Sequence, residues 1–354
     1  MSKNKITLLI DGENLLKQAF HGSDSYWNEI HIGGIVMFLT KIRQLINEHH
    51  PQQIIICWDG AKSGKLRYDI YKPYKANREK DFYNDIEYSD KQLKREEYLN
   101  KSLLIQRVRV QQYCEELFFR QVIVEYIEAD DLIGYYCTNL VDDNEEVIIY
   151  SNDRDFCQLL SDKVSLYVAN KKILVTPKNF YLFFDFHPEN SLLIKTIEGD
   201  SSDNIYGVDG VKLKTLLKYF PEIKERKVHL NELIDKAKEF QKDKKMAKHK
   251  SLQSIIDGRN FGDLKGMELY EMNEKLVNLK LPFINDDAIE LLKDCKYLPL
   301  DDSDRGSKNL MKLMIEDGFL NVIPGGGEKY IDFLQPFLGV IKHEKDFLKN
   351  YNKS

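Results

Sequence analysis

The chain has 354 residues, of which 42% are hydrophobic and 31% are charged. That length allows a large core, arranged as two lobes or as one domain with a long extension. No apolar run approaches the roughly 18 residues that a membrane span needs, and the first residues, MSKNKITLLIDGEN, turn polar too early for a signal peptide. The composition argues against a membrane protein and predicts a globular protein of the cytoplasm.

The net charge of −5 hides an uneven distribution along the chain. Residues 61–80, AKSGKLRYDIYKPYKANREK, hold seven Lys or Arg against two acids. Residues 128–155 hold nine Asp or Glu against Arg154 alone. A basic strip and an acidic cluster thus share the first half of the chain, so the negative total does not exclude a nucleic-acid partner.

The five cysteines, at positions 57, 114, 137, 157 and 295, are odd in number and contain no CxxC pair. This pattern gives little support to a disulfide framework or a zinc site. We expect reduced thiols in the core or on the surface.

Short β-branched runs alternate with helix-like segments in the first half of the chain. The pattern predicts strands at 6–10, 53–57, 122–126 and 146–150, and helices at 33–48 and from 129 onward. Such alternation predicts an α/β fold with a mostly parallel central sheet flanked by helices. The apolar runs lack strict alternation, as is typical of strands covered on both faces.

Residues 79–121 interrupt this rhythm with a polar, Tyr-rich stretch followed by a long helical pattern. An insertion between sheet elements more often serves a site than a core. From about residue 185 helical patterns replace the strands. We therefore predict an α/β domain over 1–185 and an α-helical lobe over 186–354.

Each of the four predicted strands runs into acidic residues. The carboxyl ends of parallel strands meet at one edge of a sheet, which is where ligands bind in open α/β folds. We therefore expect these side chains to converge: Asp11, Asp59, Glu128, Asp130, Asp131, Asp153 and Asp155.

Each acid also has a simpler interpretation as a helix cap or turn residue, which stabilises a helix by about 0.5 to 2 kcal/mol. Seven converging carboxylates without counter-charge would repel one another, however, and divalent cations would relieve that repulsion. Oxygen ligands without His or Cys suit Mg²⁺ or Mn²⁺. Asp200 and Asp203 add two more acids. Two ions about 4 Å apart are typical of phosphoryl displacement, so the pattern indicates phosphodiester hydrolysis.

Six motifs, in this order, carry a resemblance to a known family: DGEN (11–14), WDGAKSGKLR (58–67), YKANR (74–78), EADD (128–131), SNDRDFCQL (151–159) and GDSSDNIYGVDGV (199–211). The chain resembles the structure-specific 5′-nucleases, which include flap endonucleases and 5′-3′ exonucleases. Within that family it looks most similar to the replication-associated ribonucleases H of T-even-like phages. The resemblance is strong over residues 5–220 and implies a PIN-like nuclease core, with an arch or bridge at 79–121.

The resemblance implies two metal sites. Asp11, Asp59, Glu128 and Asp130 would belong mainly to one, and Asp131, Asp153, Asp155, Asp200 and Asp203 to the other. Lys75 and Arg78 would be the catalytic cations at the scissile phosphate. Their other interpretation is a solvated basic helix face.

Further residues are candidates for nucleic-acid contacts. Arg67 and Lys72 lie in the basic strip, and Tyr74 either stacks on a terminal base or belongs to the core. The segment GVDGVKLKTLLKYF resembles the hairpin of a helix-hairpin-helix near residues 199–220, in which Gly207, Gly210, Lys212 and Lys214 would approach phosphates.

Lys212 stands where the family's hairpin has glycine, which puts the family's K⁺ site in question. A plain helix-turn-helix packing unit is the other interpretation of this segment. Residues 212–250 hold thirteen Lys or Arg against six acids, which predicts either a duplex-facing surface or a solvated helical face.

The resulting hypothesis is a two-Mg²⁺ 5′-nuclease, in which Mn²⁺ can substitute. It would cleave DNA or RNA·DNA near a 5′ end or flap and remove primers during phage replication. The expected partners are branched or nicked duplexes and, by resemblance, a single-stranded-DNA-binding protein; we expect a monomer. A non-catalytic scaffold for branched DNA and a PIN-type ribonuclease remain as other hypotheses.

Overall fold

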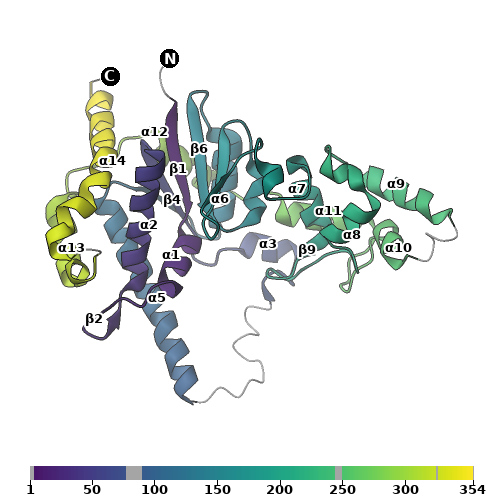
Figure 1. The fold of residues 1–354 in the computed structure, drawn as a ribbon, viewed down its shortest axis with the longest axis horizontal. Coiled ribbons are helices and arrows are strands. Elements are labelled where there is room, and N and C mark those ends of the chain that lie inside the picture. Colours follow the sequence, from purple (N-terminus) through teal and green to yellow (C-terminus); the bar gives the residue numbers. More distant parts are fainter. Residues whose placement is uncertain (1–3, 77–89, 244–248, 324–325, 354) are drawn as a thin grey trace. The chain divides into compact units, whose positions relative to one another are not determined.

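The computed structural model describes residues 4–76, 90–243, 249–323 and 326–353 (Figure 1). Six strands form the central sheet in the order β5-β4-β1-β6-β7-β8. The pairs β1/β4, β1/β6 and β4/β5 are parallel, and β7/β8 is antiparallel. The predicted α/β class with a mostly parallel sheet is therefore confirmed.

The chain forms two compact units. Unit 1 comprises the described parts of residues 1–61, 85–152 and 284–354, and unit 2 those of residues 62–84 and 153–283. Both units are discontinuous along the chain, whereas the domains predicted from the sequence are continuous. The division into functional domains at residue 185 stays a prediction.

Unit 1 contains the parallel strands and the helices that cover them. Its elements are β1 (Lys5–Asp11), α1 (Gly12–His21), β2 (Tyr26–Trp27), β3 (Ile30–His31), α2 (Gly33–His49), β4 (Gln53–Trp58), α5 (Asp90–Glu116), β5 (Arg120–Ile123), α6 (Ala129–Tyr135), a π-helical turn (Tyr136–Leu140), β6 (Glu145–Ser151), α12 (Asp286–Tyr297), α13 (Ser307–Glu316), two short 3₁₀ turns (Phe319–Asn321 and Gly327–Lys329) and α14 (Tyr330–Tyr351).

The parallel strands are buried on both faces, as their apolar sequences predict. All six residues of β4 are buried, and Leu8, Leu9 and Ile10 of β1 have no exposed surface. Helices α1 and α2 lie side by side against these strands (Figure 1). Gly12 begins α1 where a Cβ would lie 2.7 Å from the Trp58 ring, so only glycine allows this close packing.

Two buried ion pairs fix the C-terminal helices to unit 1. Arg120 of β5 contacts Glu344 of α14 at 2.5 Å, and Lys296 of α12 contacts Glu145 of β6 at 2.6 Å. The side chains of all four residues are no more than 1% exposed. Because a buried charge without a partner is costly, these pairs require α12 and α14 to lie against the strands.

Unit 2 contains the antiparallel pair and most of the remaining helices. Its elements are α3 (Lys65–Ile70), the 3₁₀ helix η2 (Arg154–Leu159), β7 (Val164–Val168), β8 (Ile173–Val175), two short 3₁₀ turns (Phe180–Leu182 and Pro188–Asn190), α7 (Ser191–Glu198), the hairpin strands β9 (Gly199–Asp200) and β10 (Ile205–Tyr206), α8 (Leu213–Tyr219), a 3₁₀ turn (Pro221–Lys224), α9 (Leu230–Gln241), α10 (Lys250–Asp257) and α11 (Met267–Val277).

The long helix predicted in the 79–121 insertion is present as α5, whereas residues 77–89 lie outside the described part of the chain. All five cysteines are free, as predicted. Within the described ranges, none of the helices combines the length and hydrophobicity needed to span a membrane. The cytoplasmic location stays a prediction.

Candidate active site

Asp11 lies at the carboxyl end of β1 and caps helix α1. Its Oδ1 accepts the Asn14 N–H at 3.0 Å, and its Oδ2 accepts the Ser151 hydroxyl, at the end of β6, at 3.0 Å. The side chain is 6% exposed. The cap interpretation is therefore correct for Asp11, and the Asn14 N–H and the Ser151 hydroxyl orient its carboxylate.

Asp59 follows β4 and reaches the start of α6, where the EADD motif lies. Its Oδ1 accepts the Ala129 N–H at 2.9 Å. Glu128 and Asp131 are buried at this helix end, with 5% and 1% of their surfaces exposed, and Asp130 is partly exposed. Acidic side chains at a helix N-terminus are stabilised by the helix dipole. Unit 1 thus brings Asp59 to the EADD motif and Asp11 to the end of β6, as the strand-end argument predicts.

Arg107 of α5 contacts the same edge of unit 1. It donates through Nη2 to the Asp59 carbonyl at 2.6 Å, and its Nε lies 2.6 Å from a Glu13 carboxylate oxygen. No role was predicted for Arg107, because it lies in a helix whose polar residues share no distinctive spacing. Its contacts place this part of α5 beside the acidic residues at the carboxyl ends of the parallel strands.

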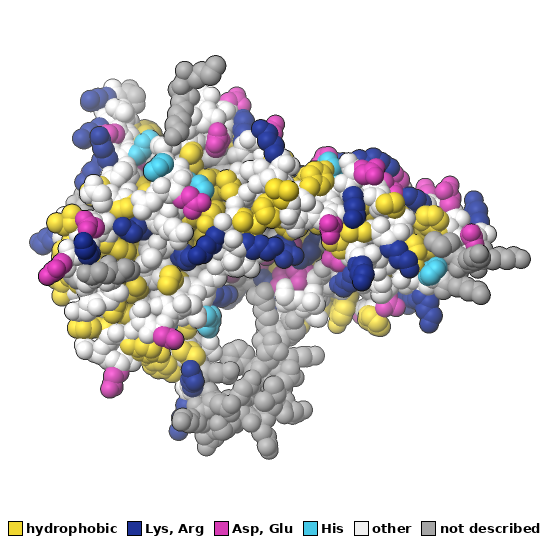
Figure 2. Space-filling model, viewed as in Figure 1, with side chains coloured by type: hydrophobic (Ala, Val, Ile, Leu, Met, Phe, Trp, Pro, Cys, Tyr) yellow, Lys and Arg dark blue, Asp and Glu magenta, His cyan; other side chains and the backbone are white. Residues whose placement is uncertain are grey.

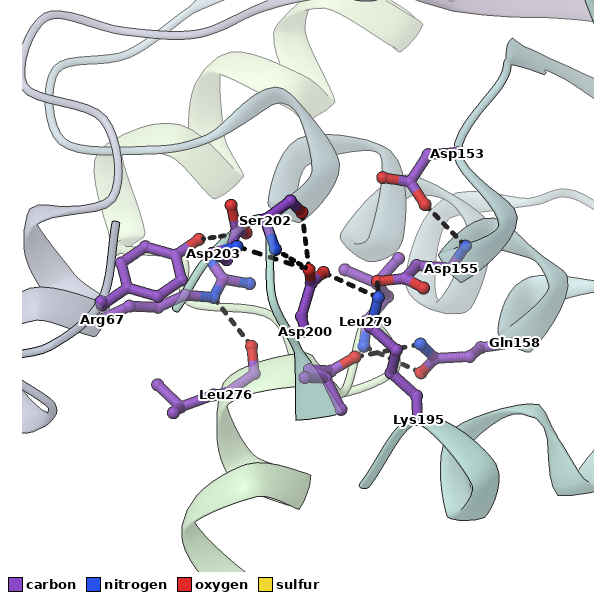
Figure 3. Close-up of polar contacts among 12 residues, drawn as sticks. Arg67, Asp153, Asp155, Gln158, Lys195, Asp200, Ser202, Asp203, Leu276 and Leu279 are labelled. Carbon is purple, nitrogen blue, oxygen red and sulfur yellow. Dashed lines mark hydrogen bonds and ion pairs between the residues drawn. The ribbon is translucent and has the colours of Figure 1, made fainter. Parts of the chain in front are cut away.

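The acids of unit 2 form a second group (Figure 3). Asp153 caps η2 by accepting the Asp155 N–H at 2.8 Å. Asp200 accepts the Ser202 N–H at 2.8 Å and the Ser202 hydroxyl at 2.6 Å through Oδ1. Asp203 accepts the Tyr74 hydroxyl at 3.2 Å.

Lys195 of α7 bridges two of these acids. Its Nζ lies 2.9 Å from Oδ2 of Asp155 and 2.7 Å from Oδ2 of Asp200, and Figure 3 shows it between the two carboxylates. The sequence shows this lysine in LLIKTIEGD, but one lysine in an apolar helix carries no spacing signal. Only the fold reveals that it faces the acids.

The two acids that share Lys195 differ in pKa. Burial, and then repulsion from Asp153, raise the pKa of Asp155 to about 7 in spite of the lysine. The pKa of Asp200 is lowered to about 2, because hydrogen bonds from Lys195 and Ser202 outweigh its burial. Burial also raises the pKa of Asp153. The negative charge around η2 is therefore only partly neutralised by the lysine.

Among the described residues, no three His, Cys, Asp or Glu side chains are arranged as ready-made ligands of one metal ion. The four acids of unit 2 are nevertheless close enough for Asp200 and Asp203 to raise the pKa of Asp153. The assignment of the nine acids to two metal sites stays a prediction.

Lys75 and Tyr74 of the YKANR motif lie beside the acids of unit 2. The Lys75 N–H donates to the Asp203 carbonyl at 2.9 Å, and its Nζ lies 5.0 Å from the Tyr74 ring. Tyr74 is 5% exposed and packs with Tyr71, Ile205 and Leu276. These contacts favour the core interpretation of Tyr74 over base stacking. Arg78 lies outside the described residues.

Arg67 and Lys72 differ in what they offer to a nucleic acid. Arg67 is 4% exposed, donates to the Leu276 carbonyl at 2.9 Å and lies 4.7 Å from the Phe283 ring. Its guanidinium serves the interior of unit 2, so the structure gives no support to its predicted nucleic-acid contact. The Lys72 side chain is 65% exposed and remains a candidate.

The predicted hairpin lies between α7 and α8. Gly207 packs against backbone, since a Cβ there would lie 2.1 Å from the Glu198 carbonyl oxygen. Gly210 has a φ of +70°, as a tight turn requires, and a Cβ there would lie 3.9 Å from the Ser251 hydroxyl oxygen. Lys212 Nζ donates to the Glu198 carbonyl at 2.9 Å, and Lys214 is exposed. Gly210 and Lys214 are therefore better placed than Gly207 and Lys212 to meet a phosphate.

Lys and Arg side chains are scattered among acidic ones over α8, α9 and α10 on the face shown in Figure 2. Several are paired, as Lys236 is with Glu222 at 2.7 Å and Lys238 with Asp235 at 3.1 Å. The visible face is not uniformly basic. The duplex-facing surface and the solvated face both stay predictions for residues 212–250.

The family model of the 5′-3′ exonuclease N-terminal, resolvase-like domain matches residues 6–185. The 5′-3′ exonuclease of Halalkalibacterium halodurans is 31% identical over 224 residues, which are 60% of this chain and 68% of that relative. The chain belongs to the 5′-3′ exonuclease family. It is therefore a structure-specific 5′-nuclease, an enzyme that hydrolyses phosphodiesters, and the predicted family is confirmed.

Solved structures of bacteriophage T5 enzymes share the fold of this 5′-nuclease. The T5 5′-exonuclease with bound divalent metal ions (zinc) matches with a TM-score of 0.61 and 21% identity, covering 89% of this chain and 99% of that one. The T5 flap endonuclease in a complex with DNA and metal ions matches with a TM-score of 0.61 and 20% identity, covering 89% and 98%. The likeness extends through both compact units of the chain.

Proposed function

We propose that this 5′-nuclease depends on two Mg²⁺ ions and cleaves DNA or RNA·DNA next to a 5′ end or flap. The observation that carries the proposal is the pair of acid groups described above. Unit 1 gathers family acids at the ends of parallel strands, and unit 2 gathers four more, of which Asp155 and Asp200 contact Lys195. All nine acids of the family motifs are present.

The donors fit a hard divalent cation. They are carboxylates without a His or Cys partner, which suits Mg²⁺ or Mn²⁺ rather than zinc. The raised pKa of Asp155, caused by burial and by Asp153, marks negative charge that Lys195 neutralises only in part. When bound, such cations supply a nucleophilic water near neutral pH and stabilise the charge that develops on phosphate oxygens.

The residues around the acids hold them in place for this role. Asn14 and Ser151 orient Asp11, and the Ala129 N–H orients Asp59. Preorganised groups of this kind need no rearrangement when charge develops in the transition state. Lys75, whose backbone is bonded to Asp203, would extend its ammonium to the scissile phosphate, with Arg78 as the second cation.

The substrate proposal is supported by the family and by the nature of its solved relatives. The T5 flap endonuclease was solved with DNA and metal ions, which supports a flap or branched duplex as the partner here. Lys72, Gly210 and Lys214 are the residues we propose for phosphate contacts; a K⁺ ion at the hairpin has no support beyond the resemblance. Primer removal in phage replication, a single-stranded-DNA-binding partner and a monomeric state belong to the same proposal.

Cleavage of a 5′-labelled flap, a nicked duplex and an RNA-primed duplex tests the proposal. We expect cleavage with Mg²⁺, none with EDTA, and none by Asp153→Asn of unchanged fold. Equal cleavage in EDTA would contradict the metal mechanism. Tight flap binding without cleavage would favour the scaffold, and cleavage of single-stranded RNA alone would favour the PIN-type ribonuclease.

A further inference from the structure

Lys195 holds a position among the acids of unit 2 that a cation would otherwise take. Its Nζ contacts Oδ2 of Asp155 and Oδ2 of Asp200 at 2.9 and 2.7 Å (Figure 3). The three side chains are only 22%, 23% and 16% exposed, so water screens the charges weakly. Oδ1 of Asp200 is bonded to Ser202, which leaves Oδ2 as the oxygen that Lys195 occupies.

A divalent cation and this ammonium compete for the same oxygens. Mg²⁺ binds carboxylate oxygen at roughly 2.1 Å, and an ammonium within hydrogen-bond distance of that oxygen would repel the ion strongly in a weakly screened site. The absence of a ready-made ligand group among the described residues agrees with this picture. The lysine holds two of the acids in an ion-paired arrangement.

We propose that Lys195 is a resident counter-ion of the unit 2 acids, which it must release before a divalent cation binds there. The inference rests on the proposed function and adds a positioning residue to it. In the metal-free protein Lys195 keeps Asp155 and Asp200 together, and it weakens metal binding by the energy needed to move it. Lys195 thus sets the metal concentration at which this acid group fills.

The structure offers the lysine a place to go. A cavity of about 320 Å³ opens beside Asp155 and Lys195, and its lining includes Asp185 and Glu198. A lysine has four rotatable bonds and stays hydrated in such a space. The cavity and its two other carboxylates therefore allow Lys195 to swing away from Asp155 and Asp200 without unfolding α7.

The first test uses the wild-type chain with Ca²⁺ as a probe and no nucleic acid. The side-chain NH₃⁺ signal of Lys195, assigned with Lys195→Arg, is followed by NMR during the titration. We expect the signal to shift and its protection from solvent exchange to fall as Ca²⁺ binds. A Lys195 signal that stays unchanged at saturating Ca²⁺ would overturn the proposal.

The second test measures Ca²⁺ affinity by calorimetry in charge variants. Lys195→Met should bind Ca²⁺ about tenfold more tightly than the wild type, and Lys195→Arg should stay within about threefold. Lys238→Met is the matched control, since it removes a lysine bonded to Asp235 on an exposed helix of the same unit. Equal or weaker Ca²⁺ binding by folded Lys195→Met would contradict the counter-ion role.

Thermal unfolding separates this role from a merely structural one. Without metal, Lys195→Met should melt about 5 °C below the wild type because Asp155 and Asp200 lose their shared cation. Ca²⁺ should remove that difference in melting temperature, whereas the difference would remain if the lysine were only structural.

Two failures can be told apart. If the protein binds no divalent cation and shows no metal-dependent cleavage, the proposed function fails. If it binds Ca²⁺ with Lys195 unmoved, only this inference fails.

Discussion

Neutral hydrogen-bond donors hold carboxylates in both acid groups of the molecule, and in unit 2 a lysine also contacts them. In unit 1, Asp11 and Asp59 accept hydrogen bonds from backbone N–H groups and a serine hydroxyl. In unit 2, Asp155 and Asp200 share the ammonium of Lys195. An ammonium cancels part of the charge that a divalent cation would otherwise meet. We therefore expect unit 2 to take a divalent cation only by displacing Lys195.

The largest expected effect comes from removing one carboxylate charge in each group. Asp11→Asn and Asp155→Asn should each lower kcat on a 5′-flap substrate by about a thousandfold, because a cation loses a charged ligand. Asparagine caps helices as well as aspartate does, so Asp11→Asn should cost less than about 1 kcal/mol of folding stability. Flap cleavage and urea unfolding of the same preparations measure the two quantities.

These paired variants also distinguish the cap interpretation of Asp11 from the metal interpretation. If Asp11 were only a cap, Asp11→Asn would keep both its stability and its activity. Asn14→Ala, which leaves the carboxylate in place, is the control for disturbed local geometry, and it should retain most of the activity.

A smaller loss of activity should follow from removing Lys75, whose backbone is bonded to Asp203 in unit 2. Lys75→Ala should lower kcat by about a hundredfold, with Ca²⁺ affinity unchanged, because a cation at the scissile phosphate acts on developing charge. Single-turnover cleavage measures this effect. Lys72→Ala is the matched control from the same basic strip, and a comparable loss of kcat in that variant would argue against a specific role for Lys75.

Ca²⁺ binding should depend on pH through the acids of unit 2, because Asp155 has a pKa of about 7. A divalent cation binds this carboxylate only when it is ionised. The affinity of the protein for Ca²⁺ should therefore fall by up to about tenfold per pH unit below neutrality. Asp155→Asn should lose this dependence. Calorimetric titrations across the neutral range measure it, and an unchanged profile in the variant would remove Asp155 as the cause.

The raised pKa of Asp155 also predicts how the folding stability of the metal-free protein changes with pH. The pKa of Asp155 is raised from its ordinary 3.8, so folding favours its protonated form, and stability should increase as the pH falls from about 7 toward 4. Asp200, with a pKa of about 2, has the opposite sign: its contribution is present above its ordinary 3.8 and is lost as the pH falls toward 2. Unfolding at stepped pH should show both slopes.

The smallest expected effect is on duplex binding, in a comparison of the exposed Lys214 with the buried Arg67. Lys214→Ala should weaken duplex binding by two- to threefold and reduce the salt dependence by about one phosphate contact. Arg67→Met should instead cost about 2 kcal/mol of stability, because the Leu276 carbonyl loses its buried donor. Filter binding at several salt concentrations, beside urea unfolding, measures both; a reduced salt slope in Arg67→Met would reverse this assignment.

The sequence predicted the sheet and its acidic edge well, because both depend on local signals. Buried parallel strands read as apolar runs, and an acid after such a run lies at the sheet edge whatever the loops do. The strand predicted at 122–126 was misplaced at both ends, since β5 spans Arg120–Ile123. It ends early because the chain turns at Tyr126, which has a φ of +70° and donates to the Ala61 carbonyl. The predicted strands also omitted β7 (VSLYV) and β8 (ILV), although β-branched and aromatic residues of this kind are typical of strands.

The contacts of charged side chains could not be predicted, because they depend on tertiary packing. Arg67 lies in a basic strip yet turns inward to Leu276, and Lys195 lies in an apolar helix yet faces two acids. The pairing of Lys296 with Glu145 joins residues 151 positions apart, which no local pattern encodes. Charge counts along the chain therefore predict where acidic residues cluster, but they do not predict which Lys or Arg side chains contact those acids.

Anomalous scattering from a Mn²⁺-soaked crystal of the wild-type chain tests the central claim most directly, which is that both acid groups hold divalent cations. We predict a manganese peak at each of the two acid groups. One should be bound mainly by Asp11, Asp59, Glu128 and Asp130. The other should be bound by acids that include Asp153, Asp155 and Asp200, with Lys195 moved off the latter two. Manganese absent from these acids, or a peak at only one group with Lys195 still bridging Asp155 and Asp200 at saturating Mn²⁺, would contradict the account.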